Sequence, residues 1–193
     1  MHARAQLAAI ATAAALALTA CSGGSTVTDT PKAAPSASKD ATTETPAEET
    51  PAAPKVAKVG DTIALKGTDD GSKLDVTVVK VSDPAKSSDE FFAPEQGKRW
   101  IGVQFRLVNT GTIAYSDSPS NGTKIADSEG QQFTSTFADI TAGPSMASGV
   151  NLKPGAKALG WVVFEVPKAS KGMTVQFTMD SGFADQTGEW KLS

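Results

Sequence analysis

The strongest strand signal in this sequence is the stretch 99-RWIGVQFRLV-108. Its apolar side chains recur at every second position, at Ile101, Val103, Phe105 and Leu107, while Gln104 and Arg106 fall on the opposite face. Because successive side chains of a β-strand point to opposite faces of the sheet, this alternation predicts a strand with one face in a hydrophobic core.

The same period of two continues on both sides of this stretch, from residue 59 to the end of the chain. Turn signals rich in Gly, Pro, Asn and Asp separate the segments, and no helical period is long enough to predict a helix. The doubled valine Val78-Val79 predicts a bulge or burial on both faces. The predicted strands are 60–65, 74–81, 99–108, 113–115, 123–127, 131–135, 149–153, 159–166 and 173–179. Eight to ten short strands predict an all-β fold, namely a β-sandwich.

Three tryptophans are expected to pack in this domain. Trp100 and Trp161 lie in core-like strands, and Trp190 near the end of the chain is expected to cover the sandwich.

Several turn and strand motifs resemble those of a known family. They are Val59-Gly60-Asp61-Thr62, Trp100 to Gly111, Asp127-Ser128-Glu129-Gly130 with Phe133, and Leu152 to Pro167. Their order over residues 58–180 resembles the telokin-like, immunoglobulin-fold domain of Gram-positive surface lipoproteins, which is related to secreted mycobacterial immunogenic proteins. The resemblance implies an immunoglobulin-like sandwich and no established activity. Nothing carries over from it to Phe91 and Phe92.

The first twenty residues have the features of a bacterial lipoprotein signal peptide. Arg4 gives a weak positive start, and residues 7–20 are apolar, too short a run to cross a bilayer core, which takes about 20 residues. The run ends in Leu18-Thr19-Ala20-Cys21, which reads as a lipobox, so Cys21 is predicted to carry diacylglycerol after cleavage. The alternative is ordinary secretion, with cleavage after Ala17 and Cys21 left as a free thiol.

A polar segment follows Cys21. Of the 34 residues from 22 to 55, 23 are Pro, Ala, Thr or Ser, a composition that predicts disorder. We therefore expect a signal peptide (1–20), a lipidated cysteine with a disordered tether (21–57) and the sandwich (58–193). A glycosylated stalk, or a segment that grips cell-wall polymer, is the alternative for the tether.

Composition excludes several chemistries. The chain has one cysteine, Cys21, and one histidine, His2, which leaves with the signal peptide. The mature chain therefore lacks the base of a Ser-His-Asp or Cys-His enzyme, the usual zinc ligands and any disulfide. The net charge of −3 does not favour nucleic-acid binding. We expect no enzyme, no cofactor and no metal; a hydrolase that works through carboxylates remains an unfavoured alternative.

Three side chains are candidates for a partner surface: Phe91 and Phe92 in a long polar loop, and Met146 in a Gly- and Ser-rich loop. The alternative for the two phenylalanines is that they fold back and cap the core. The sequence thus favours a non-enzymatic binding module, held by lipid on the outer face of the cytoplasmic membrane, with a protein, cell-wall or envelope-lipid partner. A small-molecule or lipid carrier, with an apolar cavity between the sheets, is the second hypothesis.

Overall fold

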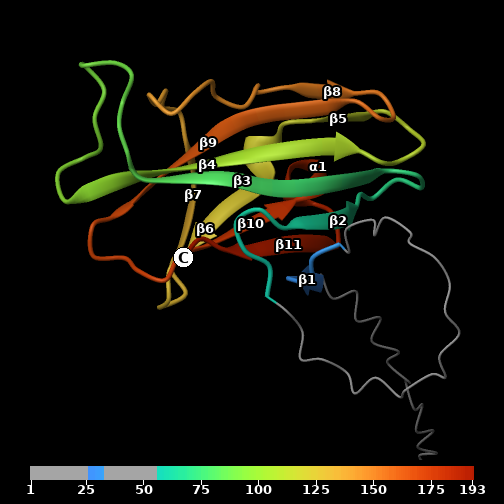
Figure 1. Cartoon of the computed structure of the whole chain (residues 1–193), viewed down its shortest axis with the longest axis horizontal. Coiled ribbons are helices and arrows are strands. Elements are labelled where there is room, and N and C mark those ends of the chain that lie inside the picture. The colour runs from blue at the N-terminus through green and yellow to red at the C-terminus, as the bar shows by residue number, and fades with distance from the viewer. Residues whose placement is uncertain (1–25, 33–55) are drawn as a thin grey trace, which may run out of the picture.

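The computed structural model describes residues 26–32 and 56–193, and these form a β-sandwich (Figure 1). Nine strands join in the order β1-β11-β10-β6-β7-β9-β4-β3-β2, and β5 pairs with β8 in a small second sheet. The predicted all-β, immunoglobulin-like class is confirmed. The strands are β1 (Thr26–Thr28), β2 (Thr62–Lys66), β3 (Lys73–Ala85), β4 (Lys98–Asn109), β5 (Tyr115–Asp117), β6 (Thr123–Ala126), β7 (Gln132–Thr136), β8 (Val150–Leu152), β9 (Lys157–Pro167), β10 (Thr174–Thr178) and β11 (Gln186–Lys191), with a 3-10 turn at Pro119–Gly122 and one helical turn, α1 (Met179–Gly182).

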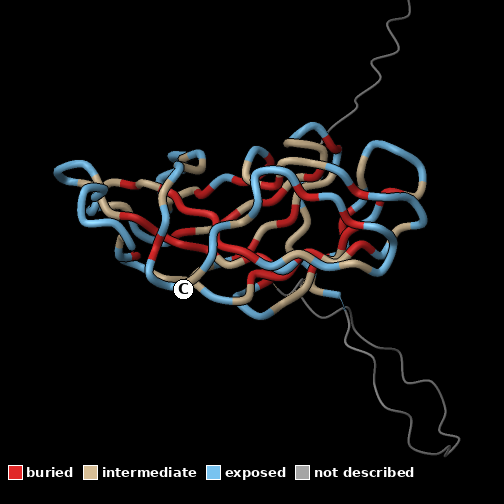
Figure 2. Tube along the Cα trace, turned by 90° about the horizontal axis from the view of Figure 1, so that it is seen from above, coloured by how far each residue is buried: buried red, intermediate tan, exposed pale blue. Residues whose placement is uncertain are grey.

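The core lies between the two halves of the nine-stranded sheet. Strand β4 supplies Ile101, Val103, Phe105 and Leu107, all fully buried, as the alternation in 99–108 predicts. The ring of Phe105 packs 5.7 Å from that of Phe177 on β10 and 6.5 Å, edge-on, from that of Trp190 on β11. Figure 2 shows the buried trace through the middle of the domain and exposed loops at both ends. Trp190 is therefore part of the centre of the core rather than a cover for it.

Strand β9 is buried on both faces, which explains why its sequence is almost continuously apolar. Val162, Phe164 and Val166 face the main core. Trp161 and Val163 face outward and join a second, smaller cluster with Trp100, Ala85 and Ile140. The expected packing of Trp100 and Trp161 is confirmed, but it occurs on the outer face of the β4–β9 sheet.

The doubled valine marks a β-bulge. The pairing of β3 with β4 shifts register between Val78 and Lys80, so Val79 has no partner opposite it. Val78 is fully buried, whereas Val79 is partly exposed. The extra residue lets apolar side chains on either side of it stay on the core face.

The predicted disorder is wrong for residues 26–32. Strand β1 pairs in parallel with β11, from Thr26 opposite Gln186 to Thr28 opposite Gly188. The amide of Ala57 donates to the carbonyl of Asp29 (2.6 Å), and the amide of Lys32 donates to the carbonyl of Thr62 (2.6 Å). A backbone ladder on an open sheet edge needs no apolar side chains, which is why composition missed it.

The domain also begins before residue 58, because Ala57 is fully buried. The predictions for the signal peptide, for Cys21 and for the rest of the tether concern residues 1–25 and 33–55, which lie outside the described residues. In the described part of the chain, no helix has the length and apolar character needed to cross a membrane.

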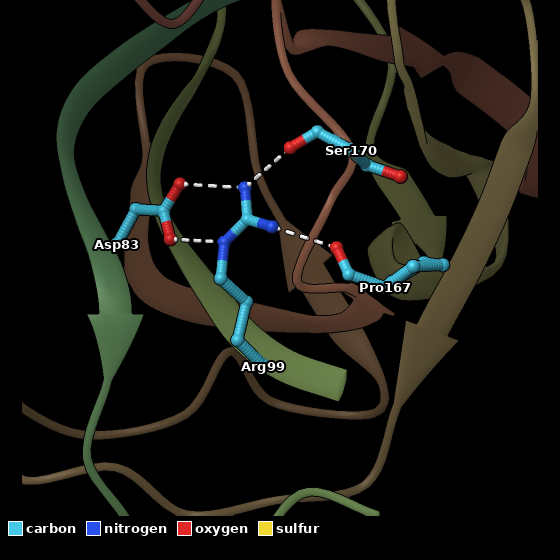
Figure 3. Close-up of polar contacts among 4 residues, drawn as sticks. All are labelled: Asp83, Arg99, Pro167 and Ser170. Carbon is cyan, nitrogen blue, oxygen red and sulfur yellow. Dashed lines mark hydrogen bonds and ion pairs between the residues drawn. The ribbon is translucent and has the colours of Figure 1, made fainter. Parts of the chain in front are cut away.

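Arg99 joins three segments at one end of the sandwich (Figure 3). Its guanidinium donates to both carboxylate oxygens of Asp83 on β3, at 2.7 and 3.2 Å, and to the carbonyls of Pro167 (2.7 Å) and Ser170 (3.0 Å). The side chain is 16% exposed, so water screens these contacts only in part. Arg99 thus connects the β3–β4 pair to the segment after β9.

We predict that Arg99→Lys lowers the free energy of unfolding by about 2 kcal/mol, because an ammonium group cannot reproduce the planar fork and leaves carbonyls without donors. Urea denaturation measures this difference. Arg106→Lys is the matched control, since Arg106 lies on the same strand and its guanidinium makes one long contact, 3.3 Å, to the Thr77 hydroxyl. An equal effect of the two substitutions would contradict the bracing role of Arg99.

Candidate functional site

A cleft of about 590 Å³ lies along β9, beside the second apolar cluster. Its floor is Trp161, Val162 and Val163. One wall comes from the end of β7 and the residues after it (135–139) together with the loop after β3 (87–92), and the other from residues 145–148. With Ser120 from the 3-10 turn, the cleft joins five separate segments of the chain.

Backbone hydrogen bonds hold both walls in place. On one side, the amide of Met146 donates to the carbonyl of Trp161 (2.7 Å), and the amide of Trp161 donates to that of Pro144 (3.0 Å). On the other side, the amides of Ser88 and Thr141 donate to the carbonyls of Asp139 (3.0 Å) and Lys86 (2.9 Å). The walls thus extend the β-sheet beyond its named strands through isolated bridges between Ser87 and Ile140 and between Ser145 and Trp161.

Aromatic side chains project from these walls into solvent. Phe92 is 63% exposed and Phe137 is 98% exposed, and both line the cleft. Met146 also lines the cleft while part of it packs on the main core. Phe91 is 85% exposed but does not line the cleft.

Of the three sequence candidates, the structure brings Phe92 and Met146 together and leaves Phe91 outside. The alternative that the phenylalanines cap the core is wrong, because both rings are exposed. Sequence reasoning missed Phe137, which directly follows strand β7, where Phe133 is the one apolar residue. The one available signal was the position of Phe137. It lies just before Ala138 and Asp139, where the strand pattern of period two ends and a loop begins.

Polar groups of the cleft are engaged mostly in holding its loops. The hydroxyl of Ser145 donates to the carboxylate of Asp139 (2.7 Å), and the amide of Phe91 donates to that of Asp89 (2.8 Å). The indole N–H of Trp161 is buried and has no partner, and Gly143 packs against it, where a Cβ would lie 2.8 Å from the nitrogen. Any larger residue at position 143 would push this wall outward.

The cleft does bring two carboxylates, Asp89 and Asp139, to its wall, as a carboxylate hydrolase would require. The carboxyl groups whose pKa values are lowered by hydrogen bonds, Asp117, Asp127 and Glu165, do not line the cleft. Nor do the described residues contain three metal-ligating side chains grouped closely enough to hold an ion. An apolar floor and exposed aromatic side chains make the arrangement suited to binding.

Glu165 supports the cluster next to the cleft. Burial alone would raise its pKa, but hydrogen bonds from the Lys98 ammonium, the Trp100 indole (3.0 Å) and the Glu95 amide (3.2 Å) outweigh burial and lower it. A lowered pKa favours the folded state above the ordinary pKa of glutamate, about 4.3, and this contribution disappears as pH falls through the folded value. The orientation of Trp100 is therefore fixed most firmly at neutral pH.

Fold and site together define a class: an immunoglobulin-like β-sandwich with an aromatic-rimmed cleft along β9. Residues 66–188 match the family described as a domain of unknown function, DUF4352, and the chain belongs to this family. A search of curated proteins finds no match. The family description states no activity, so it indicates no enzymatic class.

Solved structures show the same fold. The yjhA protein of Bacillus subtilis is 18% identical, with a TM-score of 0.53 over 72% of this chain and 100% of that one. A "putative lipoprotein (ycdA)" of Bacillus subtilis is 15% identical, with a TM-score of 0.50 over 66% of this chain and 38% of that one. The secreted protein MPT63 of Mycobacterium tuberculosis is 20% identical, with a TM-score of 0.47 over 70% of this chain and 95% of that one. The family match and the first two structures confirm the fold and the resemblance inferred from the turn motifs.

Proposed function

We propose that this protein is a lipid-anchored, extracytoplasmic binding module that engages its partner at the aromatic-rimmed cleft. The observation that carries this proposal is the projection of Phe92 and Phe137 from walls that the backbone holds rigid. Because the walls are preformed, a partner loses little free energy in ordering them. Covering one fully exposed phenyl ring contributes about 1.5–3 kcal/mol to a complex, so the two rings supply apolar anchors for a partner.

The site of action follows from the N-terminal sequence. An apolar run that ends in Leu18-Thr19-Ala20-Cys21 supports export and lipidation, and a lipid on Cys21 places the domain outside the cytoplasmic membrane. The partners within reach there are envelope proteins, cell-wall polymers and lipids. Among these the open shape of the cleft favours an extended ligand, such as a protein segment or a polymer.

A small-molecule carrier is the second candidate. The cleft volume falls within the range of about 300–1,000 Å³ that is typical of small-ligand sites. However, the carrier hypothesis expects a cavity between the sheets, whereas the cleft lies along β9 and has the exposed Phe137 and Phe92 at its rim. The space between the sheets, where a carrier would hold its ligand, is filled by the side chains of Phe105, Phe177 and Trp190.

Photo-cross-linking on intact cells tests the binding proposal. A photoreactive phenylalanine analogue is placed in turn at Phe137, Phe92, Phe91 and Val59; Val59 is exposed and does not line the cleft. We expect one shared adduct from positions 137 and 92, a weaker one from 91, and none from 59. The cross-link from 137 should also disappear when Phe92→Ala is introduced. A crosslinked product that is equally strong at position 59, or that survives Phe92→Ala unchanged, would sink the proposal.

A further inference from the structure

The docked strand β1 limits how far the domain can lie from Cys21. The amide of Thr26 donates to the carbonyl of Asp185 at 2.5 Å, and Thr26 pairs with Gln186. Five peptide steps separate Cys21 from Thr26, so their Cα atoms are at most about 18 Å apart. If β1 were not docked, 35 steps would separate Cys21 from Val56, with a limit of about 120 Å. On the proposed lipid anchor, docking therefore holds one particular end of the sandwich close to the bilayer.

That end carries exposed apolar side chains. Phe183, just after α1, is 82% exposed; Val27 on β1 is 58% exposed and Ile113 is 38% exposed. The loop 67–72 connects them, because the amide and hydroxyl of Thr68 donate to Asp180 at 2.6 and 2.9 Å, and a Cβ on Gly71 would lie 3.6 Å from Ile113. Figure 1 shows β1, α1 and β2 toward one end of the domain and the loop between β3 and β4 at the other.

The backbone next to Phe183 is held in an uncommon conformation. Asp180 and Ser181 both have a φ of 54°, in the left-handed region. Asp117 fixes this turn, since its carboxylate accepts the amide (2.9 Å) and the hydroxyl (2.6 Å) of Ser181 as well as the hydroxyl of Tyr115 (2.9 Å). The fixed turn therefore holds the Phe183 ring in an exposed position and keeps it from folding back onto the core.

The charges at this end are mixed. Four lysines, Lys66, Lys73, Lys153 and Lys157, lie there with five aspartates, Asp69, Asp70, Asp117, Asp180 and Asp185. An excess of one negative charge does not oppose contact with zwitterionic lipid, and aromatic side chains are favoured at the membrane–water interface. A lipid surface is therefore compatible with the polarity of this end.

We propose that the surface formed by Val27, Ile113 and Phe183 rests on the outer leaflet of the bilayer to which Cys21 is anchored. This inference rests on the proposed lipid anchor and adds an orientation to it. The docking of strand β1 keeps this surface close to the membrane, because it limits the length of chain between Cys21 and the domain. The loop 86–97 that carries Phe92 then points away from the bilayer, toward the envelope.

Site-specific labelling tests the orientation. Cys21 is the only cysteine, and lipid blocks its thiol, so Phe183→Cys creates a unique attachment point for an environment-sensitive fluorophore. The lipidated full chain is reconstituted into phosphatidylcholine vesicles with and without brominated acyl chains. We expect severalfold stronger quenching by brominated lipid at position 183 than at position 91 in the matched variant Phe91→Cys. Thr26→Pro removes the amide that Asp185 accepts, and should reduce the quenching at 183 severalfold while the protein stays on the vesicles.

The outcomes separate the two proposals. Protein that stays on the vesicles but shows equal quenching at 183 and 91 overturns the orientation and leaves the anchor intact. Protein that leaves the vesicles contradicts the anchor itself. A shielded label at 183 in dilute detergent, without vesicles, would show that a second copy covers this surface, and would also overturn the orientation.

Discussion

Trp190→Ala is expected to lower the free energy of unfolding by about 3–5 kcal/mol, a large share of the stability of a domain of this size. The indole is fully buried, packs edge-on against Phe105, and donates its N–H to the carbonyl of Asp61 (3.0 Å). Removing it leaves a cavity between the two halves of the sheet and a carbonyl without its donor. It also loosens β11, the strand on which β1 is docked.

Urea denaturation followed by circular dichroism measures this loss, and two variants bracket it. Trp190→Phe keeps most of the apolar volume and loses the hydrogen bond, so it should cost less than Trp190→Ala. Phe183→Ala removes a ring that is 82% exposed, and should change stability by at most about 0.5 kcal/mol. A small effect of Trp190→Ala, similar to that of Phe183→Ala, would mean that the core does not depend on β11.

Alternation in the sequence predicted the strands that carry the main core. In β4 and β10, one face is buried and the pattern of apolar residues leaves little choice of register. The bulge at Val79 was also predictable, since two adjacent valines cannot share one face of a regular strand. These features depend on local sequence alone.

Features that depend on long-range contacts were not predictable. Thr26–Thr28 reads as part of a disordered tether, and its order comes from the open edge of β11, which lies about 160 residues later in the chain. The sequence of β9 does not show which of its faces points outward, because both faces are apolar. The cleft brings together Phe92, Phe137 and Met146 only because their separate loops cross the same part of β9. The sequence therefore indicated two residues of the cleft, Phe92 and Met146, and not the cleft itself.

The composition of the predicted mature chain carries functional information of its own. A chain without a histidine and with a single cysteine cannot build the common nucleophilic and zinc sites. The orientation proposed for the domain needs both kinds of information. The sequence supplies Cys21, and the structure supplies the docking of Thr26 five residues later.

Cys21→Ser is expected to move nearly all of the protein from the membrane fraction to the soluble fraction. A serine hydroxyl cannot form the thioether to diacylglycerol, and stable anchoring requires about two acyl chains. Phe183 and its neighbours alone are too few apolar side chains to retain the domain. Ser22→Ala is the matched control, which keeps the cysteine and should stay with the membrane.

Both proposals depend most directly on the chemical state of Cys21, and intact mass spectrometry of the protein extracted from membranes measures it. The account predicts a mature chain that begins at Cys21 and carries the mass of a diacylglyceryl group, with Cys21→Ser lacking that mass. A chain that begins at Leu18, after cleavage at Ala17, with a free thiol at Cys21 would contradict the anchor and with it the proposed orientation.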